Sequence, residues 1–321
     1  MLYSFLKIFV RLAMAIFCRK IIINKPDALR AKGPLLIASN HPNSFLDSVI
    51  FNALFEQTVW SLTRGDVFKN KLAARVLTSL KMMPVYRTSE GADNLPENYK
   101  TFDACIEVFR HNGVVMIFSE GKCINEWHLR PLKKGTARLA IKAWQENIPL
   151  QVLPVGINYS SFWRFGKNVF INFGTAISKD NIDLTAKEGL RNQAFNHELN
   201  QQFEHLVFEI PNGNKQKQKE ILEIEPSGFK KIALAVPAAI GWIVHAPLYL
   251  PVKRFTWKRT YNNDHYDSVM TAILLFSYPI YLLLLILVFY MLTKSVYVFL
   301  LLLILPFTAW SYVQLKPQVD K

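Results

Sequence analysis

The sequence predicts an α/β domain flanked by membrane-associated segments, and three observations support this class. Strand-like and helix-like segments alternate between about residues 22 and 210, which is typical of an α/β domain. The 321-residue chain is 51% hydrophobic with 23 phenylalanines, and its longest apolar segments lie at the two ends. The formal net charge of +14 favours an anionic partner, either nucleic acid or a membrane surface.

Residues 1–24 are expected to form an N-terminal membrane-associated amphipathic helix. The stretch MLYSFLKIFVRLAMAIFCRKIII is apolar but carries Lys7 and Arg11, which lie four positions apart and therefore on one helical face. It has neither the leading positive charges nor the small-residue cleavage site of a secretory signal. We predict a helix lying in the membrane interface, with a tilted span or an ordinary core helix as alternatives.

Residues 25–210 are expected to form the globular domain. Short apolar runs bounded by turn residues predict strands, and apolar residues at helical spacing predict helices. The expected strands are 35–38, 83–86, 114–118, 150–156 and 169–173, and the expected helices are 45–55, 71–81, 102–111 and 136–146. A polar linker, 211–230, follows; it contains PNGNKQKQKE and is typical of a solvated hinge.

Residues 231–321 are expected to form a C-terminal membrane region. The runs 268–293 and 295–313 have about the length needed to cross a bilayer and predict a helical hairpin, 268–313. Basic residues before the first run and after the second place both hairpin ends, and the globular domain, on the cytoplasmic side of the inner (cytoplasmic) membrane. The stretch 232–250 has basic residues on both sides and two prolines, so an interfacial or re-entrant segment is preferred over a crossing.

Cysteine usage and motif content narrow the function classes. The three cysteines are widely spaced and form no CxxC pair, which argues against a disulfide framework and a zinc site and suits a reducing compartment. No zinc-finger, basic-zipper or RNA-binding signature is evident. Membrane lipids, rather than nucleic acid, are therefore the expected partners of the basic chain, whose oligomeric state the sequence leaves open.

The stretch SNHPNSFLDSV, residues 39–49, is the first candidate site. His41 lies on a strand-to-helix connection, where functional sites are commonly built. A structural interpretation competes, because Ser44 and Asp47 fit a capping box at the start of the helix. A lone histidine beside a helix cap is more often structural than catalytic.

Four further motifs follow in order: MMPVYR (82–87), IFSEG (117–121), RPLKKGTARLA (130–140) and VLPVGINY (152–159). Each alone is a weak signal. Arg87 could be a surface cation, Glu120 a turn or cap residue, and the lysines a solvated face.

Together, NHPNSFLD, MMPVYR, FSEG and VLPVG resemble the four ordered motifs of the glycerolipid acyltransferase family, over roughly residues 30–175. The family includes glycerol-3-phosphate and lysophosphatidate acyltransferases. The resemblance implies a mixed sheet with flanking helices and an O-acyltransferase that uses acyl-CoA or acyl-carrier protein as co-substrate. It implies no metal and no redox cofactor.

The resemblance also assigns roles to residues. A hydroxyl must lose its proton as it attacks a thioester, so His41 is the expected general base and Asp47 its orienting partner. Backbone amides near the His41 turn are the expected oxyanion donors. Arg87 is expected to bind the acceptor's phosphate in bidentate fashion. The full expected substrate-binding set is Arg87, Glu120, Gly121, Lys122 and Asn40.

The chain departs from the family pattern at two places. His41 and Asp47 have five residues between them rather than four, so Pro42 and Asn43 must absorb one residue in the loop. The third motif usually reads FPEGTRS but here reads FSEGKCI, with Ser119 at the proline position and Cys123 at the arginine position. Lys122, or the basic group 130–134, could supply the missing cation.

Lysophosphatidate, acylated to phosphatidate, is the preferred acceptor. Glycerol-3-phosphate and a lyso-aminolipid, such as an ornithine or glycine lipid, remain alternatives because the third motif is altered. A non-catalytic lipid-binding scaffold is the alternative of another class. A phospholipase lacks a convincing nucleophile such as a G-x-S-x-G elbow.

Overall fold

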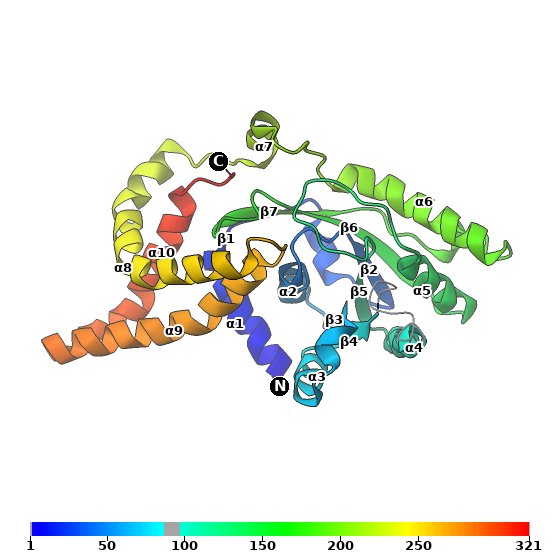
Figure 1. Cartoon of the computed structure of the whole chain (residues 1–321), viewed down its shortest axis with the longest axis horizontal. Helices are drawn as coiled ribbons and strands as arrows, with labels where there is room; N and C mark the ends of the chain where they lie inside the picture. The colour runs from blue at the N-terminus through cyan, green and yellow to red at the C-terminus, as the bar shows by residue number, and fades with distance from the viewer. Residues whose placement is uncertain (1, 87–96, 321) are drawn as a thin grey trace.

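The computed structural model describes residues 2–86 and 97–320, which form a mixed α/β sheet with flanking helices (Figure 1). The described strands form one seven-stranded sheet in the order β1-β7-β6-β2-β5-β3-β4. Neighbouring strands pair in parallel except β6 and β7, which are antiparallel. The strands are β1 (Cys18–Ile23), β2 (Leu35–Ser39), β3 (Val59–Arg64), β4 (Met82–Val85), β5 (Val114–Phe118), β6 (Gln151–Tyr159) and β7 (Lys167–Phe173).

Helices cover both faces of the sheet. The described helices are α1 (Leu2–Phe17), α2 (Phe45–Leu54), α3 (Lys71–Ser79), α4 (Glu97–Arg110), α5 (Lys134–Gln145), α6 (Glu188–Leu206), α7 (Lys215–Leu222), α8 (Gly228–Thr260), α9 (Tyr266–Thr293) and α10 (Leu301–Leu315). One core cluster joins α1 and α2 to the sheet, and a second joins α4, α5 and α6. Leu35 and Ile37 of β2 enter the first cluster, whereas Leu36 and Ala38 enter the second, so β2 is buried on both faces.

The sequence missed two strands. Residues 18–23 were expected to continue the N-terminal helix, but they form β1, which pairs in parallel with β7. The three consecutive isoleucines that end β1 are β-branched and favour a strand once a partner edge is available. β3 was also missed; it joins β5 to β4 and so completes that side of the sheet.

The two basic residues of α1 form hydrogen bonds with the protein itself. Lys7 donates to the Phe55 carbonyl at 2.6 Å, and Arg11 donates to the Ala53 carbonyl at 2.5 Å. Both carbonyls lie at the C-terminal end of α2, where unpaired carbonyls and the helix dipole favour cations. Three large apolar side chains of α1 are nevertheless exposed, namely Phe5, Ile8 and Leu12.

The predicted linker is not wholly irregular. Residues 215–222 form α7, in which Gln218 and Leu222 are buried, and Leu222 belongs to the core cluster of α1 and α2. This helix was not predicted because its sequence is mostly polar, and only the residues that face the domain need to be apolar.

Three described helices are long and apolar enough to cross a membrane, namely residues 228–260, 266–293 and 296–315. The chain is therefore membrane-associated. The predicted hairpin corresponds to α9, a short 3-10 segment (Val296–Leu300) and α10. Gly241 of α8 lies against Thr308 of α10, where an added Cβ would lie 2.1 Å from the Thr308 carbonyl oxygen, so α8 and α10 pack closely at this point.

Both ends of α8 contact the globular domain. Just before α8, the Ile224 N–H donates to Gln318 Oε1, which also accepts from the side chain of Asn168 in β7. Just after α8, Asp264 Oδ1 accepts from the Asn125 N–H. α8 is bent in Figure 1, and it contains Pro237, Pro247 and Pro251, which remove helix hydrogen bonds and permit bending. A single crossing would separate the two ends of α8 by a bilayer, and residues 232–250 stay predicted as an interfacial or re-entrant segment.

Candidate active site

The first and third motifs meet at one edge of the sheet. β2 and β5 are parallel neighbours, with Ser39 beside Phe118 at their carboxyl ends. His41 follows β2 and Glu120 follows β5, so the two loops leave the sheet side by side. This is the edge at which α/β sheets commonly build their sites.

His41 and Asp47 form a hydrogen-bonded pair. His41 Nδ1 lies 2.8 Å from Asp47 Oδ2, and the Asp47 side chain is fully buried while that of His41 is 12% exposed. A carboxylate can only accept, so the proton lies on Nδ1 and Nε2 carries the free lone pair. The His41 ring stacks on Phe118 with centroids 3.8 Å apart, which holds the ring plane. The longer spacing of this motif is thus compatible with a productive pair.

Asp47 has two further donors. The Tyr159 hydroxyl donates to Asp47 Oδ1 at 2.6 Å, and the Asn43 backbone N–H donates to Asp47 Oδ2 at 2.8 Å. Both donors stabilise an ionised carboxylate that has no contact with solvent. Tyr159 ends β6 and its side chain is fully buried. Sequence reasoning missed Tyr159, although it is the last residue of the quoted stretch VLPVGINY.

Glu120 fixes the His41 backbone. Its Oε2 accepts from the His41 N–H at 2.8 Å, and its Oε1 accepts from the Arg130 N–H at 2.9 Å. The residue is 5% exposed, and burial raises the pKa of this carboxyl, partly offset by the two backbone hydrogen bonds. Its predicted role in acceptor binding stays a prediction; the structure shows it joining the first motif to the third.

Asn40 is held inside the fold. It was expected to bind substrate, but its side chain is buried and both of its polar atoms contact the Ile157 backbone. Nδ2 donates to the Ile157 carbonyl at 3.0 Å, and Oδ1 accepts from the Ile157 N–H at 2.8 Å. Asn40 therefore joins the end of β2 to β6, and its substrate-binding role stays a prediction.

The expected capping box at Ser44 is also wrong. Ser44 occupies the N-cap position of α2 with a φ of 54° and makes no side-chain cap hydrogen bond. Its Oγ lies 2.6 Å from His265 Nδ1, and its N–H donates to Cys123 Sγ at 2.8 Å. Burial raises the pKa of the Cys123 thiol well above its usual value, so Cys123 is a neutral acceptor that holds the turn.

Ser119 replaces the family's proline with two additional hydrogen bonds. Its N–H, which a proline would lack, donates to the Ser39 carbonyl at 2.9 Å. Its Oγ accepts from the Thr136 hydroxyl at 2.9 Å. These contacts tie the third motif to β2 and to the first turn of α5.

The predicted oxyanion donors are occupied. The backbone N–H groups of His41, Asn43 and Ser44 donate to Glu120, Asp47 and Cys123, as described above. Pro42 has no N–H to offer. The amides of the His41 turn therefore build the turn itself, and they are not free to bind an oxyanion in this geometry.

Several basic residues surround this edge. Lys122 and Lys133 are exposed, and the Lys133 side chain passes Gly121, whose φ of +68° favours glycine. Arg130 is partly committed, because its Nε lies 2.5 Å from Glu126 Oε1. Arg87 lies outside the described residues.

The connection between α8 and α9 adds residues that the sequence did not single out. His265 contacts Ser44, and Asp264 Oδ1 accepts from the Asn125 N–H at 2.9 Å. Burial lowers the pKa of His265, so the ring is neutral at pH 7. Only the fold could reveal these contacts, because His265 lies 221 positions after Ser44.

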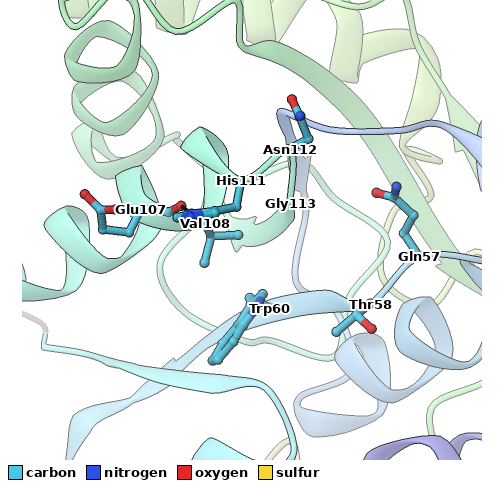
Figure 2. Close-up of a pocket in the computed structure, with 8 residues that line it drawn as sticks. All are labelled: Gln57, Thr58, Trp60, Glu107, Val108, His111, Asn112 and Gly113. Atoms are coloured by element: carbon cyan, nitrogen blue, oxygen red, sulfur yellow. Dashed lines mark hydrogen bonds between the residues drawn. The ribbon is translucent and has the colours of Figure 1, made fainter.

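A pocket of about 510 Å³ lies at the opposite edge of the sheet (Figure 2). Its lining residues lie at or just before the starts of β3 and β5 or belong to the end of α4: Gln57, Thr58, Trp60, Glu107, Val108, His111, Asn112 and Gly113. Because β2, β3 and β5 are parallel, the amino ends of these strands lie far from the carboxyl ends that carry His41. The pocket and the candidate site are therefore separate.

Comparisons with known proteins define the class. An acyltransferase family model matches residues 20–158, the segment that contains all four motifs. A similar solved structure is the 1-acyl-sn-glycerophosphate acyltransferase from Thermotoga maritima, at 13% identity and a TM-score of 0.41, with 63% of this chain and 79% of that chain covered. No curated protein sequence matches.

The family match and the site agree. Residues 20–158 match the acyltransferase family, and this match supports the family predicted from the four motifs. The predicted mixed sheet with flanking helices is confirmed as well. The chain thus combines an acyltransferase-family segment, residues 20–158, with helices that are long and apolar enough to cross a membrane.

Proposed function

We propose that this protein transfers a fatty acyl group from an acyl thioester to the hydroxyl of a lysophospholipid. The proposed acceptor is 1-acylglycerol-3-phosphate, the product is phosphatidate, and the donor is acyl-CoA or acyl-acyl-carrier protein. The observation that carries this proposal is the His41–Asp47 pair, in which Asp47 holds Nδ1 and leaves Nε2 as a base.

The reaction proceeds in two steps. The acceptor hydroxyl gives its proton to His41 Nε2 while its oxygen attacks the thioester carbonyl and forms a C–O bond. The tetrahedral intermediate then expels the thiolate, the C–S bond breaks, and the thiolate takes the proton from His41. Buried Asp47 stabilises the transient imidazolium, and the reaction uses no metal or redox cofactor.

Membrane attachment supports a lipid acceptor. α9 begins beside the His41 turn and is long and apolar enough to cross a bilayer, so a lipid in the bilayer has a short path to the site. We propose that the domain faces the cytoplasm, because the basic residues that flank α9 and α10 favour that side.

One observation favours a second acceptor class. Cys123 occupies the position where the family usually has an arginine, and its sulfur is turned inward to the Ser44 N–H. The site therefore lacks one of the family's usual cations, which is compatible with a phosphate-free lyso-aminolipid.

The test is a product assay with the full-length protein in lipid nanodiscs. Acyl-CoA or acyl-acyl-carrier protein is supplied with lysophosphatidate, glycerol-3-phosphate or a lyso-ornithine lipid, and products are identified by mass spectrometry. We expect the fastest turnover with lysophosphatidate, and Arg87→Lys should raise its KM while leaving the donor KM almost unchanged. Faster acylation of the lyso-ornithine lipid, with no effect of Arg87→Lys, would contradict the phosphate acceptor and leave acyl transfer intact.

A further inference from the structure

Asn43 is one of the two residues expected to absorb the longer first motif, and the structure shows how it is held. It is fully buried and donates to two carboxylates. Its backbone N–H reaches Asp47 Oδ2 at 2.8 Å, and its side-chain Nδ2 reaches Asp267 Oδ2 at 2.7 Å. Asn43 thus connects the candidate catalytic carboxylate to a second carboxylate that lies 224 positions later in the chain.

Asp267 lies in the first turn of α9 and is fully buried. It forms an ion pair with Lys167, the first residue of β7, which is also fully buried. A buried carboxylate is tolerated only when it is paired and hydrogen-bonded, and Lys167 and Asn43 meet both requirements. This ion pair fixes the start of α9 to β7, beside the His41 turn.

Two neighbouring contacts strengthen the attachment. Ser44 Oγ lies 2.6 Å from His265 Nδ1, and the Leu46 N–H donates to Ser268 Oγ at 3.2 Å. The start of α9 therefore contacts three of the four residues from 43 to 46. Ser44 has a left-handed backbone, which costs energy for a non-glycine residue and persists only where the surroundings hold it.

We propose that Asp267 is a positioning residue of the acyl-transfer site. Through Asn43 it holds the lengthened turn in the shape that brings Asp47 to His41, so the membrane region forms part of the catalytic unit. The proposal rests on the function proposed above, in which the His41–Asp47 pair is the base. Its physical basis is that a six-position spacing on one straight helix would point the two side chains well apart, so the turn must be held in a non-helical shape.

The experiment compares two charge-free double variants in nanodiscs. Asp267→Asn with Lys167→Met removes both charges but keeps an oxygen that accepts from Asn43. Asp267→Leu with Lys167→Met removes both charges and that oxygen. Neither double variant leaves one charge buried without its partner, so the comparison isolates the hydrogen bond from Asn43.

We expect the kcat of the Asn variant to stay within about five-fold of wild type. The kcat of the Leu variant should be at least about ten-fold lower than that of the Asn variant, because small misplacements of catalytic groups can lower the rate by about 10²-fold. The KM for the acyl donor should change less than about two-fold in both, because donor binding does not involve the turn. Equal kcat in the two double variants, at equal unfolding temperature, would overturn the proposal.

One further variant tests the role of Asn43 if the Leu variant does not fold. Asn43→Ala removes the side-chain donor but keeps the backbone N–H that reaches Asp47, and it should also lower kcat at least about ten-fold. An Asn43→Ala protein with wild-type kcat would likewise overturn the proposal.

The matched control is Thr271→Val, one turn further along α9, whose hydroxyl has no partner among the described residues. This variant should have wild-type kcat, and a loss as large as that of Asn43→Ala would mean that any change in α9 disturbs the site. If His41→Ala is as active as wild type, the proposed function itself fails, which the variants of Asp267 cannot mimic.

Discussion

The two edges of the sheet each carry a histidine whose Nδ1 lies 2.8 Å from an oxygen, yet they differ in every other respect. His41 contacts a fully buried carboxylate, which is itself held by Tyr159 and Asn43. His111, at the edge shown in Figure 2, is exposed, and its ring is hydrogen-bonded to the Glu107 backbone carbonyl one turn earlier. The 510 Å³ pocket lies beside His111. The candidate catalytic site is therefore identified by buried polar groups that hydrogen-bond to one another, and not by the size of a nearby cavity.

The largest expected effect separates the two histidines. His41→Ala should lower kcat by about 10²-fold or more, the usual contribution of a general base. His111→Ala should leave kcat within about two-fold of wild type, because surface changes away from a site have small effects. Product formation by mass spectrometry is the measurement. Equal losses in the two variants would show that the distinction between the edges is wrong.

The next effect concerns the carboxylate that joins the motifs. Glu120→Gln has one acceptor oxygen in place of two, so one backbone N–H, of His41 or of Arg130, loses its partner. An unsatisfied buried donor costs about 1–3 kcal/mol, and we expect about a ten-fold loss of kcat as the His41 loop shifts. Glu107→Gln at the opposite edge is the matched control and should have wild-type kcat. Activity of Glu120→Gln equal to that of the control would contradict this assignment.

A smaller effect is expected at Tyr159. Tyr159→Phe keeps the buried ring but removes the donor to Asp47 Oδ1, while the donors from His41 and Asn43 remain. Hydrogen bonds to charged groups contribute about 1.5–3 kcal/mol, so the unfolding temperature should fall. We expect kcat to fall by about five-fold, less than for Glu120→Gln, because Asp47 keeps two partners. An unfolding temperature equal to that of wild type would show that this hydrogen bond contributes nothing.

The smallest effect is a pH dependence of stability. Burial raises the folded-state pKa of Glu120 above its ordinary value of 4.5, so the folded protein keeps this proton to higher pH than the unfolded chain. The folded state then binds more protons in that window, and the free energy of unfolding falls as pH rises through it. Wild type should therefore lose stability relative to Glu120→Gln between about pH 4 and the raised pKa.

Thermal unfolding of both proteins in one detergent, at steps of pH, measures this difference. A difference that stays constant with pH, or that grows in favour of wild type, would contradict the raised pKa.

The sequence predicted the parts of the site that lie within short motifs. His41 and Glu120 were found because each follows a recognisable apolar run, and Asp47 because it lies in the same motif as His41; the structure brings all three together. The contacts of both Asn40 amide atoms with the Ile157 backbone were not foreseen, because a local motif does not show which distant strand a side chain reaches. Lys122 and Gly121 lie at the same edge, and their binding roles stay predictions, as does that of Arg87.

The sequence alone determined the alternating elements, the acyltransferase motifs and the apolar C-terminal helices, because hydrophobic period and motif order are local properties of the chain. Tertiary structure alone decided which distant groups complete the site. Tyr159 contacts Asp47 across 112 positions, and Asp267 contacts Asn43 across 224 positions. Such contacts have no local signature, because they depend on the strand order that places β6 beside β2 and on the packing of α9 against the His41 turn.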